Sequence, residues 1–165
     1  NEKDLCTGWA PGELSALGIR QAKELGDQVS DMHFDALFCS DLKRAVDSAE
    51  LGFADKYKIV QDKRLRECNY GDFTQSSEDK VDYEKYINNP FPNGESLKDV
   101  EKRMLDFLNF LKGNFEGRHL ALLAHKAPQL ALEVLLNKKT WEQAIAEDWR
   151  NRKAWQPGWE YSIED

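Results

Sequence analysis

The stretch ALFCSDLKRA, residues 36–45, decides the fold class of this chain. Its first four residues are continuously apolar, which predicts a short buried strand, and the residues after them begin a helical pattern. A second apolar run, LALLA at residues 120–124, ends at His125 and also precedes a helical pattern. Buried strands that alternate with helices predict an α/β fold.

A cation and an imidazole follow these two strands. Arg44 lies just beyond the first strand, and His125 lies just beyond the second. In open α/β sheets, ligands bind outside the carboxyl ends of the strands. A guanidinium that can bind two oxygens, placed with an imidazole at one sheet edge, predicts a site for a phosphoryl group.

The flanking segments extend this pattern. Ser15 is expected to cap a helix that runs to about residue 30, and Asp41 to open a second helix that runs to about residue 51. Ile59–Val60 predicts a short strand. Capping-box patterns at residues 96–99 and 140–143 predict two more helix starts. The aromatic tail, residues 149–163, is expected to form an edge strand over the core.

Composition limits the function classes. The chain has 165 residues, of which 41% are hydrophobic and 32% charged, as expected for one globular domain with a sizeable core. Its formal net charge of −7 argues against a nucleic-acid surface, which needs a basic stripe. A local cluster of cations can still bind a small anion. No apolar run reaches membrane-spanning length, so neither nucleic acid nor a membrane is an expected partner.

The cysteines offer one competing reading of the phosphate site. The chain has three, Cys6, Cys39 and Cys68, and their spacing suits neither a zinc site nor a disulfide framework, which favours a reducing cytoplasm. The spacing from Cys39 to Arg44 is similar to the C-x₅-R loop of cysteine-dependent phosphatases. Here only four residues intervene, and the loop lacks glycines. Cys39 is therefore interpreted as the buried end of a strand, with a nucleophilic role as the alternative.

Several segments together resemble the motifs of the histidine phosphatase superfamily (phosphoglycerate mutase-like). Residues 40–50, SDLKRAVDSAE, are similar to that family's S-D-L-x-R-A-x-x-T-A-E. The other similar segments, in family order, are GW at residues 8–9, LSALGIRQA at 14–22, RLRECNYG at 64–71, NGES at 93–96 followed by Val100 and Arg103, and AH at 124–125.

The resemblance implies a three-layer α/β/α sandwich with a mostly parallel central sheet, formed by a single domain at residues 1–165. Family members begin with a strand that ends in R-H-G-E-[ST]-x-x-N, whose His is the nucleophile. Asn1 matches the closing Asn of that motif, so we expect the strand and the nucleophile upstream of this sequence. Arg118–His119 is followed by Leu120 instead of Gly and is interpreted as structural, as is His33.

The resemblance also implies roles for residues of this chain. Glu67 is the candidate general acid, and His125 is a catalytic residue that stabilises charge on the phosphoryl group. Lys126 stands where the family usually has Gly, and Glu95 is expected to support a loop. The predicted phosphate- and substrate-binding residues are Arg44, Asn1, Thr7, Gly8 and Lys126. The implied mechanism passes through a phosphohistidine and needs neither a metal nor another cofactor.

Three functions fit these features. A phosphomonoesterase that acts on a small phosphorylated metabolite is favoured, because the chain is short for a mutase of this family. A phosphoglycerate mutase is the alternative, supported by CTGW at residues 6–9 and NYG at 69–71. A non-catalytic protein that holds a phosphorylated partner is the third. The segment at residues 74–92 resembles the family's insertion over the active site, which shapes the substrate pocket.

Overall fold

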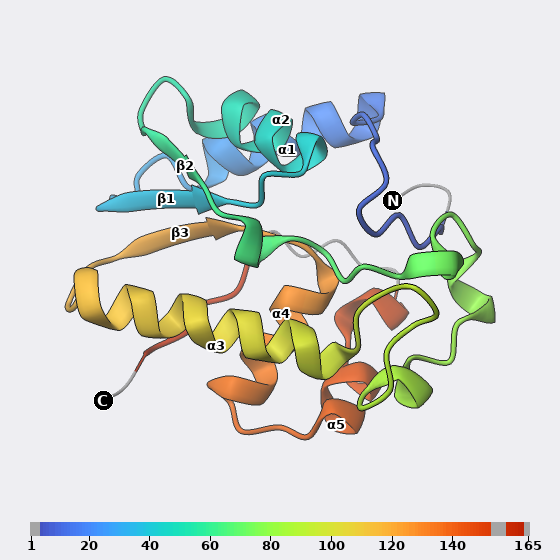
Figure 1. Ribbon diagram of the computed structural model, residues 1–165. Helices are drawn as coiled ribbons and strands as arrows, with labels where there is room; N and C mark the ends of the chain where they lie inside the picture. The colour runs from blue at the N-terminus through green and yellow to red at the C-terminus, as the bar shows by residue number, and fades with distance from the viewer. Residues whose placement is uncertain (1–3, 153–157, 164–165) are drawn as a thin grey trace.

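The computed structural model describes residues 4–152 and 158–163, which form an α/β/α sandwich (Figure 1). The strands are β1 (Ala36–Cys39), β2 (Ile59–Gln61) and β3 (Leu120–Leu123). The α-helices are α1 (Ala16–Gln28), α2 (Lys43–Phe53), α3 (Leu97–Asn114), α4 (Lys126–Leu135) and α5 (Trp141–Ala146). The 3₁₀-helices are η1 (Lys63–Leu65), η2 (Gly71–Phe73), η3 (Glu78–Lys80), η4 (Tyr83–Tyr86) and η5 (Trp149–Arg152).

The sheet is parallel, with the described strands in the order β2-β1-β3. Leu37 of the central strand pairs with Ile59 on one side and with Ala121 on the other. The carboxyl ends of all three strands therefore lie at the same edge. β3 is an outer strand of the described sheet, and its four residues are only half-buried, whereas Leu37–Cys39 are fully buried.

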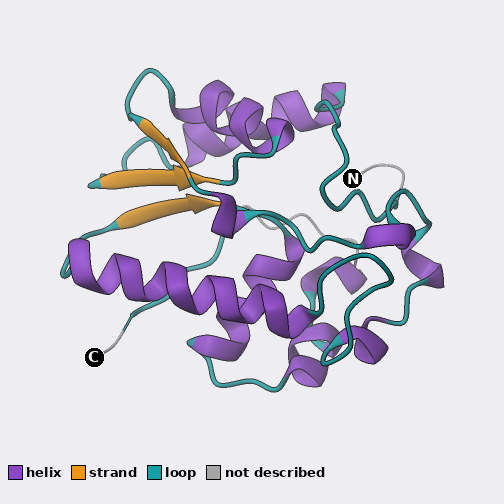
Figure 2. Cartoon of the chain, viewed as in Figure 1, coloured by secondary structure: helices purple, strands orange, loops and turns teal. Residues whose placement is uncertain are grey.

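Successive β1 side chains enter different cores, as the pleat of a strand requires. Phe38 packs edge-on against Phe107 of α3, at a ring-centroid separation of 5.5 Å. Leu37 and Cys39 instead pack in a second cluster with Ala49 of α2. Figure 2 shows the corresponding layers, with helices on both faces of the strands. The predicted three-layer arrangement is confirmed.

Helices α1 and α2 pack closely where Gly26 meets Gly52. A Cβ atom added at Gly26 would lie 2.3 Å from the carbonyl oxygen of Gly52, so only the absent side chain permits this approach. The start of α1 follows the prediction, because the Ser15 hydroxyl accepts a 3.1 Å hydrogen bond from the Gly18 N–H. Both predicted capping boxes are also present, at the starts of α3 and α5.

Two predicted features were wrong. Asp41 does not open α2; Leu42 is the N-cap residue, and the Asp41 carboxylate instead accepts two 2.7 Å hydrogen bonds from Arg66. The predicted edge strand is also absent from the described part of the tail, where residues 149–152 form η5 and residues 158–163 are irregular. Tyr161 is anchored there by its side chain, whose hydroxyl donates to Glu133 at 2.6 Å. Residues 153–157 lie outside the described part.

In the part of the chain that the structure describes, none of the helices combines the length and apolar composition needed to cross a bilayer.

Candidate active site

The Glu67 carboxylate lies at the start of α4. Its Oε1 atom accepts hydrogen bonds of 2.9 Å from the N–H groups of Ala127 and Cys68, and its Oε2 atom accepts one of 3.1 Å from the Lys126 N–H. The first N–H groups of a helix have no intrahelical partners, and the helix dipole favours negative charge there. Glu67, only 7% exposed, therefore caps a helix from another part of the chain.

His125 connects β3 to α4. It is the N-cap residue of α4, but its side chain makes no capping hydrogen bond. Its Nε2 atom is buried and has no hydrogen-bond partner among the described residues. Burial lowers the pKa of the imidazole to about 4; the Glu67 carboxylate opposes this shift, and the Arg44 guanidinium adds to it. The ring is therefore neutral at neutral pH, with an unpaired nitrogen beside two charged groups.

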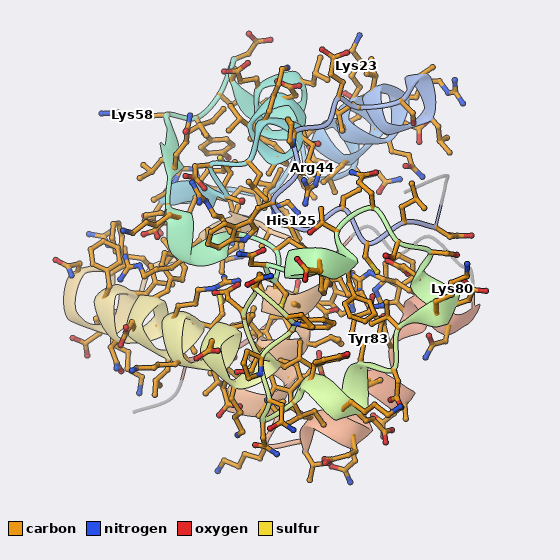
Figure 3. All side chains as sticks on the ribbon, turned by 45° about the vertical axis from the view of Figure 1, so that its right-hand side comes forward. Lys23, Arg44, Lys58, Lys80, Tyr83 and His125 are labelled. Carbon is orange, nitrogen blue, oxygen red and sulfur yellow. The ribbon has the colours of Figure 1, made fainter. Side chains whose placement is uncertain are left out.

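Arg44 enters the same site from the first turn of α2. Its guanidinium donates a 2.8 Å hydrogen bond to the carbonyl oxygen of Gly8 and a longer one of 3.4 Å to that of Ala10. Burial lowers its pKa and the Glu67 carboxylate raises it, but arginine keeps its proton in proteins. Figure 3 shows Arg44 and His125 as neighbours. The structure thus brings Arg44, Glu67 and His125 together beyond the ends of β1 and β3.

A loop from the start of the chain closes one side of this site. The indole N–H of Trp9 donates to the carbonyl oxygen of Glu67 at 2.7 Å, and Gly8 has a φ of +50°. A Cβ atom at Gly8 would lie 3.3 Å from both the Cys68 carbonyl oxygen and the Tyr70 ring. Glycine is therefore favoured there by conformation and by space.

Arg103 is the positioning residue that the sequence reasoning missed. It donates hydrogen bonds to the carbonyl oxygens of Arg64, Arg66 and Glu67, at 2.6, 2.7 and 3.0 Å. It also pairs with Glu95 at 3.0 Å, and Glu95 in turn accepts from the Asn69 N–H at 2.8 Å. One α3 side chain thus fixes the backbone that carries Glu67. Both Arg103 and Glu95 belong to a motif noted above, but the motif alone did not say what they contact.

The other predicted binding residues occupy different positions. The Lys126 ammonium group lies 4.4 Å from the ring centroid of Tyr83 and pairs with Glu78 and Asp148, at 3.8 and 3.9 Å. Thr7 is half-buried, and its carbonyl oxygen accepts a 2.9 Å hydrogen bond from the Ala10 N–H. Asn1 lies outside the described residues. The roles of all the site residues remain predictions.

The remaining candidates have structural surroundings. Cys39 is fully buried among the side chains between β1 and α2, and desolvation raises the pKa of its thiol to about 11. A thiol that stays protonated at neutral pH is a poor nucleophile. His119 lies at the opposite end of β3 from His125, where its Nδ1 atom is 2.8 Å from the carbonyl oxygen of His33. Arg118 pairs there with Asp35 at 3.2 Å.

A profile of the histidine phosphatase superfamily (branch 1) matches residues 1–153. The chain belongs to this superfamily. It is 28% identical to a 2,3-bisphosphoglycerate-dependent phosphoglycerate mutase of Parvibaculum lavamentivorans, over 88% of this chain and 78% of that protein. It is also 31% identical to an uncharacterised phosphatase of Bacillus subtilis, PhoE, over 80% of this chain and 68% of that protein.

Comparison with a solved structure supports the same fold. The mycobacterial glucosyl-3-phosphoglycerate phosphatase superposes with a TM-score of 0.75 at 26% sequence identity, over 88% of this chain and 77% of that chain. The family resemblance of the motifs and the fold that it implied are thereby confirmed.

Proposed function

We propose that this histidine phosphatase superfamily member is a phosphomonoesterase that acts on a small phosphorylated metabolite through a phosphohistidine. The observation that carries the proposal is the buried Nε2 atom of His125, which has no hydrogen-bond partner among the described residues and is close enough to Arg44 for its pKa to respond. A buried polar atom without a partner requires an explanation, and a phosphoryl oxygen supplies one.

Binding of the phosphoryl group follows from the charges at the site. The Arg44 guanidinium can form charge-assisted hydrogen bonds to its oxygens, and His125 can contact another oxygen. The N–H groups of Lys126 and Ala127, which now face Glu67, lie at a helix end where anions are favoured. These groups neutralise charge on the equatorial oxygens during transfer.

The proposed chemistry has two steps. A histidine nitrogen attacks phosphorus, the bond from phosphorus to the ester oxygen breaks, and the leaving oxygen takes a proton from Glu67. Glu67 must bind this proton before the step, as it leaves the N–H groups of α4 that its carboxylate now accepts from. Water then attacks the phosphohistidine while Glu67 accepts a proton from it, which releases inorganic phosphate and restores the histidine. Both steps require the Glu67 carboxyl group to leave or share its position at the start of α4.

The nucleophile in this proposal comes from a segment upstream of Asn1 that pairs with β3. In the described sheet, β3 is paired only with β1, and its apolar residues are half-buried. An added strand would bury these side chains and satisfy the backbone groups on that edge. It would also end beside His125, because parallel strands of one sheet share their carboxyl edge.

The test compares two proteins, the 165-residue chain and the product of the complete reading frame. We expect the longer protein to release phosphate from p-nitrophenyl phosphate and to form an acid-labile, alkali-stable phosphoenzyme, and we expect the shorter chain to do neither. Equal turnover by the purified short chain would refute the upstream nucleophile. No turnover by either would favour a phosphate-binding protein without activity.

Phosphoglycerate mutase activity is the second candidate, because relatives such as the Parvibaculum lavamentivorans protein carry that name. Interconversion of 2- and 3-phosphoglycerate without net phosphate release would favour it. Net release from a simple ester favours the phosphatase. Nuclear magnetic resonance of phosphorus distinguishes the two in one experiment.

A further inference from the structure

A cavity of about 450 Å³ adjoins the proposed phosphate site. Its walls come from residues 70–83, from the first two turns of α4, and from residues 145–151 at and beyond the end of α5, with Asp4 and Leu97 completing the lining. The two spaces share the start of α4: the backbone N–H of Lys126 contacts Glu67, whereas the Lys126 side chain lines the cavity. A group held in this cavity would therefore lie next to the proposed proton donor.

One pair of charged groups in the cavity wall is incompletely satisfied. The Lys126 ammonium lies 3.9 Å from Asp148 Oδ2 and 3.8 Å from Glu78 Oε2, which is beyond hydrogen-bond distance for both. Its side chain is 17% exposed, and it donates no hydrogen bond to the described residues. The Asp148 side chain is only 2% exposed, and its Oδ2 atom has no hydrogen-bond partner in the described part of the chain. The cavity wall thus holds a cation whose contacts with carboxylates are longer than hydrogen bonds, and a buried carboxylate oxygen without a hydrogen-bond partner among the described residues. The other oxygen of Asp148 pairs with Arg150 at 2.9 Å.

A hydroxyl group is the ligand group that fits this pair. An oxygen about 2.8 Å from each atom would accept a hydrogen bond from Lys126 and donate one to Asp148, since a hydroxyl has both capacities. An ionised carboxylate cannot donate to Asp148, and an ammonium cannot accept from Lys126. When a buried charged group loses such a partner, the cost in free energy is larger than for an ordinary hydrogen bond between neutral groups.

The charges around the cavity disfavour an acidic ligand. Four carboxylate residues line it, against two cationic ones: Asp4, Glu78, Asp79 and Asp148, and Lys126 and Arg150. Apolar side chains complete the lining and can contact a carbon chain: Val81, Leu97, Leu130 and Ile145.

We propose that this cavity binds the alcohol portion of the substrate, and that the substrates are phosphate esters of neutral, polyhydroxylated alcohols. The proposal rests on the proposed phosphatase function, because it places the phosphoryl group beside Arg44 and His125. Lys126 and Asp148 are the residues that select for hydroxyl groups. An ester with a carboxylate on its alcohol portion is selected against.

The first test measures binding to the 165-residue chain by titration calorimetry, which needs no turnover. Ribitol 5-phosphate and n-pentyl phosphate form a matched pair of esters with and without hydroxyl groups. We expect ribitol 5-phosphate to bind at least about tenfold more tightly, the effect of one hydrogen bond to a charged group. We expect 3-phosphoglycerate to bind more weakly than ribitol 5-phosphate. Equal affinities for the matched pair would overturn the proposal.

Variants then test which residues cause the preference for ribitol 5-phosphate over n-pentyl phosphate. Lys126→Met and Asp148→Asn should each reduce the ratio of the two affinities to about one, whereas Lys58→Met, at an exposed lysine far from the site in Figure 3, should leave it unchanged. Thermal unfolding checks that each variant is folded; if Asp148→Asn is not, Lys126→Met decides. An unchanged ratio of the two affinities in Lys126→Met would contradict the role of Lys126 in selecting for hydroxyl groups.

Titration with inorganic phosphate distinguishes a failure of this proposal from a failure of the proposed function on which it rests. If phosphate binds through Arg44 but the matched esters bind equally, the cavity proposal fails alone. If phosphate does not bind and ribitol 5-phosphate still binds in a Lys126-dependent manner, the cavity binds hydroxyl groups, but the phosphate site fails and with it the assignment of the ligand as an ester substrate. If neither ligand binds, both fail.

Discussion

The Oε1 atom of Glu67 accepts a 2.9 Å hydrogen bond from the Ala127 N–H, which places a carboxylate at the helix end that a phosphate would use. The carboxylate satisfies otherwise unpaired N–H groups of α4. It also competes with an incoming anion for them. Substrate binding and the release of Glu67 toward the leaving oxygen are therefore expected to occur together.

Glu67→Gln should tighten anion binding to the 165-residue chain. The substitution removes a negative charge from the site, which is expected to favour sulfate by on the order of 1 kcal/mol, or about fivefold. Calorimetric titration with sulfate measures the change, and Glu24→Gln on the exposed side of α1 is the matched control. Weaker sulfate binding in the variant would mean that Glu67 maintains the site without competing for it.

The same variant should slow the complete enzyme in a way that depends on the leaving group. An alkyl ester needs a proton on its leaving oxygen, so its single-turnover phosphorylation should slow by about 10²–10⁴-fold. p-Nitrophenyl phosphate needs that proton less and should slow less. Rapid-quench measurement of the phosphoenzyme isolates the first step. An equal loss on both esters would remove Glu67 from the role of acid.

Arg44→Ala should weaken binding of inorganic phosphate by about 2–3 kcal/mol, or on the order of 30- to 150-fold, because it removes charge-assisted hydrogen bonds. Arg20→Ala, at an exposed position of α1, controls for the loss of one positive charge. The Arg44 contacts with Gly8 and Ala10 are also lost, so the folded state is checked by circular dichroism. Unchanged phosphate affinity would exclude Arg44 from the site.

His125 should make the protein less stable in mild acid. Its pKa is about 4 when folded, below the ordinary value of 6.5, so the unfolded chain binds the proton more readily. The stability contribution is complete above pH 6.5 and is lost as the pH falls toward 4, by on the order of 3 kcal/mol. Urea unfolding of the protein and of His125→Gln across this range should give a smaller loss in the variant. Parallel curves would contradict the lowered pKa.

Arg103→Met should destabilise the fold by about 3 kcal/mol or more, because it leaves Glu95 and several carbonyl groups without their partner. For a chain of this size, that corresponds to a fall in melting temperature of about 6–12 °C. Lys102→Met, on the exposed side of the same helix, is the control. Equal melting temperatures for the two variants would show that the network adds little.

Local signals made most of the fold predictable. The strands of the sheet were found because each is a short apolar run, and the helix starts because Ser15, Ser96 and Thr140 bond to N–H groups only three residues away. The prediction that Asp41 opens α2 was wrong for the opposite reason. Its residue type favours an N-cap, but Arg66, 25 residues later, forms two hydrogen bonds with it. A tertiary ion pair replaced a local cap.

The site was predictable to the extent that its residues lie in family motifs. Arg44, Glu67 and His125 were singled out in this way, and the structure brings them together. The contacts of Arg103 join residues 36 to 39 positions apart, so no local pattern records them. Asp148 belongs to no motif that was recognised, and only the fold places it opposite Lys126.

The pairing of β1 with β3 has a consequence for the order of folding. At the start of these strands, the His119 N–H donates to Asp35, 84 residues earlier. Closing a flexible loop of this length costs about 4 kcal/mol in chain entropy. The unit from β1 to β2, by contrast, is contiguous and contains most of its own hydrophobic cluster. We therefore expect this unit to condense early and β3 to dock late. Because β3 carries His125, phosphate-binding capacity would develop only with that final docking step.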